Sequence, residues 1–447
     1  MTTKEEPAWL ARVLSPVTEV RRGEAVTALL LTLNVFLLLT AYYLIKPVRE
    51  ALILQLEAGA EYKAYMSGAI AIALLAAVPA YAKVADRLPR GKLVVGVTLF
   101  FASHLVVFFG GSLIEALRAQ LGLIFFLWVG IFNMMVVAQF WSFANDLYDP
   151  ERGQRLFPLI ALGASVGAAV GSKIAAGLIP IFDVYPMLLV AAGLLAACAA
   201  LFRWVDVREA AREKARSSAA EPASDAPPAK EARRGAFRMV FQVRYLLLIA
   251  LFSLIYNWVN SNGEYLLSRL IKAAAQDAVG RGEIGKAGVS AYIGAAYGDF
   301  FFYVNVLGLI LQTFVVSRLV KKIGLGAAFF VLPAIALGGA VTFIALPVLA
   351  VLRVAKVAEN ATDYSLNNTL RQMLWLVTTR DMKYKAKQAV DTFFVRMGDV
   401  SSALLVGAGT QLIGLSLRGY AVVDTVLIVI WLVLAAAIVR EHRRMAN

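Results

Sequence analysis

The chain has 447 residues, 60% of them hydrophobic and 17% charged, and its mean hydropathy is +0.71. A water-soluble domain has no use for so much apolar surface, so ordinary soluble enzymes and binding modules are excluded and a lipid bilayer is the expected solvent. The net charge of +14 would suggest a nucleic-acid partner in a soluble protein. Here the basic residues separate apolar segments instead of forming one face, so no nucleic-acid partner is expected.

Apolar windows of about twenty residues match the length that a helix needs to cross about 30 Å of hydrocarbon. The first half of the chain predicts six such helices, near Ala25–Leu44, Ala64–Ala82, Leu93–Gly111, Leu121–Asn145, Leu159–Leu178 and Tyr185–Trp204. The second half predicts six more, near Tyr245–Leu267, Ala291–Leu319, Ala327–Pro347, Val348–Leu376, Val390–Ile413 and Tyr420–Val439. The expected fold class is an all-α membrane protein with twelve transmembrane helices in two six-helix halves.

A polar segment, residues 205–235, separates the two halves and is too rich in charge, proline and serine to form a core. The predicted domains are an N-terminal segment (1–24), a first half (25–204), a linker (205–244), a second half (245–439) and a tail (440–447). Lysine and arginine favour the termini, the linker and the loops on their side by about three to one, so we expect these parts to be cytoplasmic. A monomer in a bacterial inner membrane is the expected state.

Cysteine and histidine, the commonest zinc ligands, are scarce in this chain. Cys198 is the single cysteine and lies in an apolar run, which excludes a disulfide framework and a cysteine-ligated metal cluster. His104 and His442 are far apart, and we expect His104 to be a packed helix residue. Because no nucleophile, base and orienting group occur together, we predict neither an enzyme nor a metal or cofactor site.

A glycine-rich run, Gly163 to Lys173, superficially looks like a phosphate-binding loop. Its spacing departs from G-x-x-x-x-G-K-[ST] and no strand precedes it, whereas glycine at every fourth position is the usual device for close helix packing. We therefore expect packing here and no ATP hydrolysis, so that transport would be secondary or by exchange.

Charged and amide side chains inside the apolar windows are the first place to look for function, since they are costly in hydrocarbon. The tenth window carries them at spacings of three and four, which makes one stripe along a helix. The stripe consists of Arg353, Lys356, Asn360, Asp363, Asn367 and Arg371. It predicts either a pore lining or an ion-paired interior seam in which Lys356 bonds Glu359 or Asn360.

Three further windows carry polar groups at helical spacing. The seventh has Ser253, Asn257, Asn260 and Glu264, the eleventh has Thr392, Arg396, Asp399 and Ser402, and the first ends with Lys46, Pro47 and Arg49. An Arg396–Asp399 bridge is as good an interpretation as a ligand contact, because the two residues are one turn apart. Lys46 and Arg49 either face a pathway or extend to the membrane interface.

Basic residues outnumber acidic ones among these intramembrane groups, and guanidinium groups suit phosphate or carboxylate oxygens. We therefore predict a small anionic substrate. The candidate binding residues are Lys46, Arg49, Asn145, Asn257, Asn260, Glu264, Arg353, Lys356, Asp363, Arg371, Arg396 and Asp399.

Two six-helix halves joined by a polar loop are the plan of major-facilitator carriers, which bind substrate near the membrane midplane. The loop after the second helix, residues 86–92 (Asp-Arg-Leu-Pro-Arg-Gly-Lys), resembles the Asp-Arg-x-Gly-Arg/Lys signature of those carriers. The corresponding place in the second half keeps Lys321 and Lys322 without the acidic residue.

Several segments more specifically resemble the ADP/ATP translocases of plastids and intracellular bacteria and their bacterial relatives. The segments are 140–145 (Phe-Trp-Ser-Phe-Ala-Asn), 149–164, 297–300 (Tyr-Gly-Asp-Phe), 364–366 (Tyr-Ser-Leu), 371–373 (Arg-Gln-Met) and 382–391 (Met-Lys-Tyr-Lys-Ala-Lys-Gln-Ala-Val-Asp). The resemblance implies the major facilitator fold and a nucleotide substrate exchanged as ATP for ADP. Of the intramembrane charges on which that family depends, Arg49 preserves one, whereas Val129, Asn260 and Asp399 do not carry the expected charge.

Two other functions fit the same residues. A proton-coupled carrier of another organic or phosphorylated anion would use Glu264, Asp363 or Asp399 to exchange the proton. A membrane receptor or assembly factor would keep the fold without transport.

Overall fold

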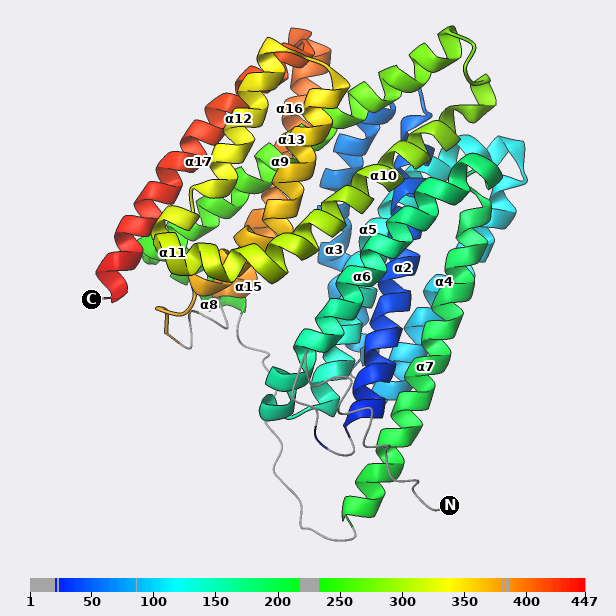
Figure 1. The fold of residues 1–447 in the computed structure, drawn as a ribbon, viewed down its shortest axis with the longest axis vertical. Helices are drawn as coiled ribbons and strands as arrows, with labels where there is room; N and C mark the ends of the chain where they lie inside the picture. Colours follow the sequence, from blue (N-terminus) through cyan, green and yellow to red (C-terminus); the bar gives the residue numbers. More distant parts are fainter. Residues whose placement is uncertain are drawn as a thin grey trace. The chain divides into compact units, whose positions relative to one another are not determined.

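The computed structural model describes residues 21, 24–85, 87–217, 233–379, 382 and 386–446. These residues are helical almost throughout and include no strand, as Figure 1 shows. The prediction of an all-α fold is confirmed. Most of the predicted N-terminal segment, the centre of the linker, part of the 382–391 segment and the last residue of the tail lie outside the described residues.

The helices follow the predicted windows closely in both halves of the sequence. Those of the first half are α2 (Ala25–Leu54), α3 (Gly59–Ala85), α4 (Arg90–Ser112), α5 (Glu115–Leu147), α6 (Pro150–Phe182) and α7 (Pro186–Ser217). Those of the second half are α8 (Arg233–Gln242), α9 (Arg244–Gly280), α10 (Val289–Ile310), α11 (Val316–Ala328), α12 (Val331–Ala345), α13 (Leu349–Thr362), α14 (Asn368–Met373), α15 (Lys387–Ala389), α16 (Val395–Ala408) and α17 (Leu417–Ala446).

Short irregular turns interrupt the helices of the second half. A 3₁₀ turn, η1 (Lys286–Gly288), precedes α10, and several π-helical turns continue neighbouring helices, among them η2 (Leu311–Val315), η3 (Asp363–Asn367), η5 (Val390–Phe394) and η6 (Gly409–Ile413). A π turn widens the helix locally and occurs frequently at functional sites.

Nine helices in the described part of the chain are long and apolar enough to cross a membrane. The other three predicted spans are α12, which is short, the charged segment α13–η3–α14, and the segment α15–η5–α16–η6, which π turns divide. Many large apolar side chains on these helices are exposed, among them Leu75, Val107, Val354 and Leu412. Lipid is the solvent that accommodates such surfaces.

The helices form two compact units. The first unit contains residues 1–52, 74–225 and 290–302, and the second contains 53–73, 226–289 and 303–447. Each unit therefore takes most of one half of the sequence and one segment from the other half. The first part of α3 belongs to the second unit, and the first part of α10 belongs to the first unit.

In the first unit, α2 and α6 pack backbone against backbone. A Cβ atom added at Gly163, Gly167 or Gly171 would lie 2.3 to 2.7 Å from backbone oxygens of α2. The packing role that the glycine spacing predicts is confirmed, because only glycine leaves room for this approach. Asp149 caps the start of α6 by accepting a hydrogen bond from the Arg152 backbone N–H at 2.9 Å, with Pro150 in the first turn.

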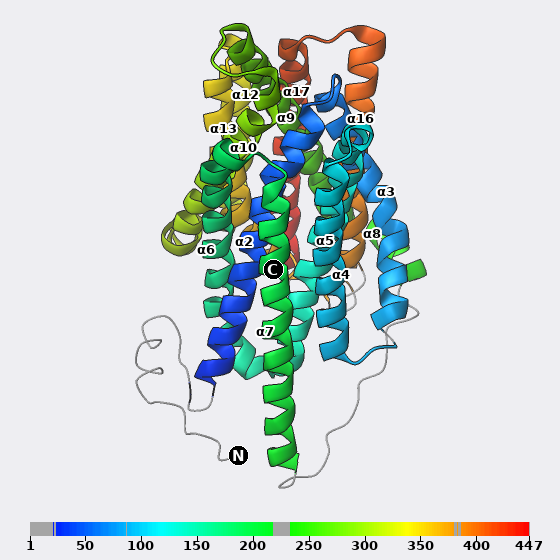
Figure 2. The same cartoon turned by 90° about the vertical axis from the view of Figure 1, so that its right-hand side faces the viewer.

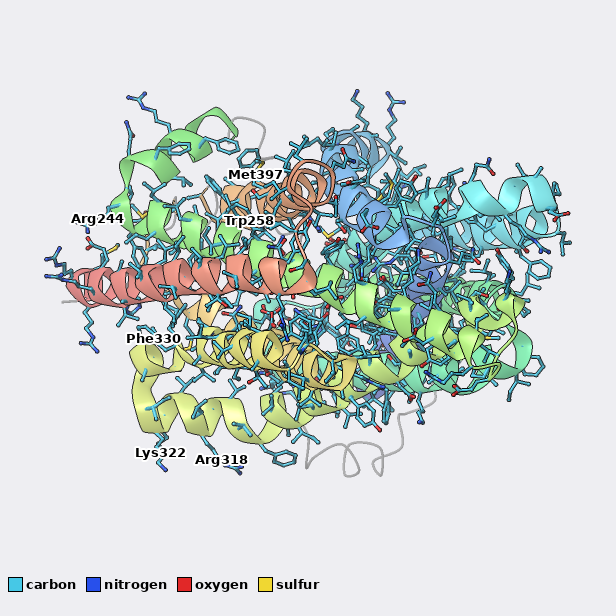
Figure 3. All side chains as sticks on the ribbon, turned by 90° about the horizontal axis from the view of Figure 1, so that it is seen from above. Arg244, Trp258, Arg318, Lys322, Phe330 and Met397 are labelled. Atoms are coloured by element: carbon cyan, nitrogen blue, oxygen red, sulfur yellow. The ribbon has the colours of Figure 1, made fainter. Side chains whose placement is uncertain are left out.

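In the second unit, α9 packs against α16 and α17, and α12 packs against α13 and α17. Figure 3 shows Trp258 of α9 beside Met397 of α16, and shows Arg318 and Lys322 extending outward from α11. A Cβ atom at Gly398 would lie 2.7 Å from the Leu254 carbonyl oxygen, so α16 meets α9 at very short range. This contact brings the polar stripes of the two helices together.

The predicted linker is partly helical. Figure 2 shows α7 continuing beyond the ends of the neighbouring α2 and α4. The helix ends at Ser217, whereas the sequence predicts that it ends at Trp204. The charged residues that indicated a loop instead form contacts on the helix: Arg212 pairs with Glu209 at 3.0 Å, and Thr27 donates to Glu209 at 2.6 Å. The sequence predicts a linker from residue 205, whereas residues 205–217 continue α7.

Candidate functional site

The candidate residues fall in both compact units. In the first unit, Lys46 and Arg49 lie on α2 and Asn145 lies on α5. The other candidates lie in the second unit: Asn257, Asn260 and Glu264 on α9, Arg353 and Lys356 on α13, Asp363 on η3, Arg371 on α14, and Arg396 and Asp399 on α16.

Lys46 is buried among aromatic rings. Its side chain is 9% exposed, and its ammonium lies 3.9 Å from the centroid of the Phe301 ring and 5.1 Å from that of Tyr43. Phe301 comes from the part of α10 that belongs to the first unit. Ring faces attract a cation without removing its charge, so these aromatic contacts keep Lys46 positively charged.

Arg49 lies one turn further along α2. Its guanidinium carbon is 4.4 Å from the centroid of Phe126, and it forms an ion pair with Glu50, whose side chain is 1% exposed. Glu50 is not among the binding residues predicted from the sequence. The signal was present, since Glu50 is a carboxylate within an apolar helix.

Asn145 lines a pocket of about 780 Å³ where α5 ends and α6 begins. The pocket walls include Trp141, Asn145, Tyr148, Gln154 and Phe157. The rings of Trp141 and Phe157 meet edge to face at 5.8 Å, and those of Tyr148 and Phe157 at 6.0 Å. Aromatic walls with a few amide groups suit a flat ligand with polar edges. Burial raises the pKa of the Tyr148 phenol, so this ring remains uncharged.

Lys356 joins α13 to α9 in the second unit. Its ammonium lies 3.0 Å from Glu359 Oε1 and donates to Asn260 Oδ1 at 3.0 Å. The side chain of Lys356 is 1% exposed. The ion pair of the interior-seam interpretation is therefore present, and an anion that binds Lys356 must compete with Glu359.

Glu264 connects the same two helices to α3. Its carboxylate accepts a hydrogen bond from Asn360 Nδ2 at 3.1 Å and forms an ion pair with Lys63 at 3.5 Å. Lys63 belongs to the part of α3 that packs in the second unit. Lys63 is not among the predicted residues, because it precedes the apolar window that predicts the second helix.

Asp399 is the centre of the contact between α9 and α16. It accepts hydrogen bonds from Asn257 Nδ2 at 2.8 Å and Ser261 Oγ at 2.7 Å, and it pairs with Arg396 at 3.2 Å. The Arg396–Asp399 bridge that the spacing allows is thus formed. Three donors from two helices thus converge on this carboxylate.

Asp363 and Arg371 are separated by a π turn, so the predicted stripe does not follow a continuous α-helix. Asp363 accepts a hydrogen bond from Asn367 Nδ2 at 2.8 Å. Arg371 pairs with Asp391 at 3.0 Å and lies over the Tyr256 ring at 5.8 Å. Arg353 lies near the start of α13, is partly exposed, and forms no ion pair with any residue that the structure describes.

Metal ligands do not gather anywhere in the described residues: no group of three or more histidine, cysteine, aspartate or glutamate side chains is arranged to hold an ion. The polar chemistry of this chain lies instead in ion pairs and amide contacts between helices. Such intramembrane groups are characteristic of solute pathways.

Comparison with known proteins places this arrangement in context. A curated relative, ADP,ATP carrier protein 1 of Chlamydia trachomatis serovar D, is 21% identical over 340 residues, which cover 67% of this chain and 61% of that carrier. ADP,ATP carrier protein 1 of Chlamydia muridarum is 21% identical over 308 residues, 61% of this chain and 55% of that carrier. The chain thus matches less than two thirds of the length of either carrier.

Solved structures of transporters share the fold. A bacterial homologue of the iron transporter ferroportin matches with a TM-score of 0.63 at 17% identity, covering 92% of this chain and 98% of that one. The nucleoside transporter NupG matches with a TM-score of 0.63 at 11% identity, covering 94% of this chain and 99% of that one. The fold is that of membrane transporters and not of enzymes. The Major Facilitator Superfamily model matches residues 31–374, and the chain belongs to that family of integral membrane transporters.

Proposed function

We propose that this chain carries an anionic solute by alternating access, and that nucleotides are the first candidates. Lys46 is the observation on which the proposal rests. Lys46 is about nine-tenths buried within the apolar helix α2, and aromatic rings surround its ammonium. A charge at that depth is costly unless it serves a solute or a partner, and a phosphate or carboxylate is the natural ligand of an ammonium group.

The charge balance of α2 supports an anion. The helix contains two cations, Lys46 and Arg49, and a single carboxylate, Glu50. By this count α2 carries a net positive charge within an otherwise apolar span. In the second unit, Lys356, Arg371 and Arg396 are paired with carboxylates.

The nucleotide part of the proposal rests on two supports. The curated relatives are named as ADP,ATP carriers. The pocket at Asn145 has aromatic walls and amide groups, which suit the stacking and edge hydrogen bonds of a nucleobase.

Lys46 and the aromatic pocket would act at different stages of transport. Ala28 of α2 packs in one cluster with Leu156 of α6 and with Tyr148, which lines the pocket. Lys46 lies eighteen residues further along the helix, about 27 Å at 1.5 Å per residue. One nucleotide cannot span that distance, so the pocket would bind the solute at entry or release.

Exchange of ATP for ADP is one form of this proposal. Its plausibility depends on the three positions that lack the charge expected from the translocases. Val129 is fully buried, Asn260 accepts from Lys356, and Asp399 pairs with Arg396. The translocases are expected to carry a charged side chain at the position of Asn260. In this chain the ammonium of Lys356 lies beside Asn260 and places a positive charge there. A proton-coupled carrier of another anion is the second candidate, favoured by the buried carboxylates of the second unit.

We also propose that the termini and the linker are cytoplasmic in a bacterial inner membrane. Arg244, Arg318 and Lys322 are exposed at helix ends that this orientation assigns to the cytoplasm (Figure 3). Protease cleavage of the linker in inverted but not right-side-out vesicles is the expected result, and the reverse pattern would overturn the orientation.

Ligand-induced stabilisation tests the substrate class. Purified protein in detergent is heated with ATP, ADP, phosphate, a dicarboxylate or an uncharged nucleoside. A ligand at a hundred times its Kd adds about 2.7 kcal/mol to the folded state, which is readily seen as a rise in Tm. We expect nucleotides to stabilise the protein and the nucleoside to do so less.

Matched variants distinguish a bound anion from a general salt effect. Lys46→Gln should remove the stabilisation, whereas Lys92→Gln, at an exposed position near the start of α4, should retain it. Equal stabilisation of both variants, or none by any anion, would contradict the proposal. Trp141→Leu should weaken binding of ATP more than binding of phosphate if the pocket holds the base.

A further inference from the structure

Asp424 is a carboxylate enclosed in the second unit that none of the contacts above uses. It lies on α17 and is 5% exposed. Its Oδ1 accepts a hydrogen bond from Asn262 Nδ2 at 2.8 Å, and Asn262 is completely buried. An acid in such a position demands an explanation, because an ionised carboxylate away from water is strongly destabilising unless a cation neutralises it.

Asp424 forms no ion pair with any residue in the described part of the chain. Lys356 is the nearest basic group in the surrounding cavity wall, and its ammonium is already committed to Glu359 and Asn260, each at 3.0 Å. A neutral, protonated carboxyl group is therefore the form that these surroundings stabilise.

The hydrogen bonds fix where the proton is held. Ser402 Oγ donates to Asn262 Oδ1 at 2.6 Å, so the amide nitrogen of Asn262 points at Asp424. Asp424 Oδ1 is then the acceptor and Oδ2 is the oxygen that carries the proton. A metal ion is disfavoured, since a cation needs several oxygen ligands and the group aimed at Asp424 is an amide donor.

A small cavity gives Asp424 a route for proton exchange. Asp424, Lys356 and Glu359 line a cavity of about 30 Å³, which is large enough to admit a water molecule. Of the helices around it, α13 contributes the two charged groups, Lys356 and Glu359. The helices α9 and α12 contribute apolar side chains to the cavity, such as Val259 and Phe343. The neutral groups Asn262 of α9 and Ser402 of α16 lie in the hydrogen-bond chain to Asp424 and do not line the cavity.

We infer that Asp424 is a proton-binding site, protonated on Oδ2 in this packing and able to pass the proton to water in the cavity it shares with Lys356 and Glu359. Loss of the proton leaves a carboxylate facing Lys356, which then has two competing acidic partners. Protonation thus alters the Lys356–Glu359–Asn260 contacts that join α13 to α9. Proton binding at Asp424 would thereby be coupled to a rearrangement of α9 and α13. This coupling rests on the proposed transport function.

Infrared spectroscopy detects the proton directly. A protonated carboxyl group in apolar surroundings gives a separate carbonyl stretching band that an ionised carboxylate lacks. The unaltered protein in lipid should show such a band near neutral pH, and Asp424→Asn should lack its Asp424 component. Identical spectra of the two proteins in this region would overturn the inference.

Carbodiimide labelling supplies a readout on the unaltered protein. Dicyclohexylcarbodiimide attacks protonated carboxyl groups in apolar surroundings and leaves a stable adduct that mass spectrometry locates. Cleavage at Arg418 and Arg440 releases residues 419–440, in which Asp424 is the single acidic residue. Cleavage at Arg396 and Arg418 releases residues 397–418, in which Asp399 is the single acidic residue.

Asp399 is the matched control, because it is paired with Arg396 and accepts hydrogen bonds from Asn257 and Ser261. Near neutral pH the label should appear on 419–440 and not on 397–418. Label on 397–418 alone would contradict the assignment.

The link to transport is tested separately. The rate of nucleotide exchange into liposomes should depend on pH in the unaltered protein and lose that dependence in Asp424→Asn. An unchanged pH profile in the variant would reject coupling. If no nucleotide is exchanged at all, the proposed substrate fails, while the infrared band and the label still decide whether Asp424 holds a proton.

Discussion

Lys63 and Glu264 are 201 positions apart in the sequence, yet Lys63 Nζ lies 3.5 Å from Glu264 Oε2 within one compact unit. Glu61 and Arg269, near the same ends of α3 and α9, form a second ion pair. The first part of α3 is thus attached by charge to a helix of the other half of the sequence. Carriers that work by alternating access rearrange their halves around the solute, so contacts of this kind are expected to open.

The first prediction concerns this ion pair. Lys63→Gln and Glu264→Gln should each lower stability, and the double variant should lose less than the sum, with a coupling free energy of about 1 kcal/mol. Exchange of the charges, Lys63→Glu with Glu264→Lys, should recover part of the loss caused by either reversal alone. Strictly additive single changes, measured by thermal unfolding in detergent, would show that the pair contributes nothing.

The second prediction contrasts two aspartates of the second unit. Asp399 accepts from Asn257 and Ser261 and pairs with Arg396, so Asp399→Asn should cost about 2 kcal/mol of stability. Asp424→Asn keeps an oxygen that can accept from Asn262, so it should change stability by less than about 1 kcal/mol. A larger loss for Asp424→Asn than for Asp399→Asn would mean that Asp424 is ionised.

The third prediction tests the close packing of α2 on α6. A Cβ atom at Gly167 would lie 2.3 Å from the Phe36 carbonyl oxygen, so Gly167→Ala should destabilise the protein by about 2 kcal/mol or more. Gly177, on the same helix, has open space at its Cβ position. Gly177→Ala should therefore be neutral or slightly stabilising, since alanine is the better helix former. Equal effects of the two changes on Tm would contradict the packing.

The fourth prediction is a dependence of stability on pH from Glu24, just before α2. Burial raises the pKa of Glu24, but its hydrogen bond with Arg155 and the nearby charges of Arg155 and Arg152 outweigh burial and leave the pKa below its ordinary value. A folded-state pKa below the unfolded one gives stability that is present at neutral pH and is lost as the pH falls through the folded pKa.

Glu24→Gln should accordingly lower stability at neutral pH, and the difference from the unaltered protein should shrink as the solution is acidified. Glu115→Gln, at an exposed position at the start of α5, is the control and should leave the profile unchanged. A stability difference for Glu24→Gln that stays constant down to acid pH would contradict the assignment.

The sequence predicts the helices well because hydrocarbon requires long apolar segments whose backbone groups bond within the helix. The same reasoning predicts the contact between α2 and α6, since Gly163, Gly167 and Gly171 are spaced to form one face. It fails at α7, where Glu209 and Arg212 look like loop residues until their partners on the neighbouring helix are known.

Partners from distant helices account for most of what the sequence could not predict. Spacing along one helix indicates that Lys356 can meet Glu359, but it cannot indicate Asn260 of α9. The π turn at Asp363 is equally invisible to a count of residues. Asp424 was detectable by the rule applied to the other windows, because it is an acid in an otherwise apolar span.

Flux into liposomes tests the central claim most directly. Purified protein is reconstituted in liposomes preloaded with ADP, and uptake of labelled ATP, phosphate and a dicarboxylate is measured with and without a proton gradient. We expect uptake of at least one anion, with ATP first, and a loss of about tenfold or more in Lys46→Gln but not in Lys92→Gln, since each 1.4 kcal/mol of lost binding is a factor of ten. No flux of any anion under either condition, with protein that is folded and inserted, would contradict transport and leave a receptor or assembly factor as the function of this fold.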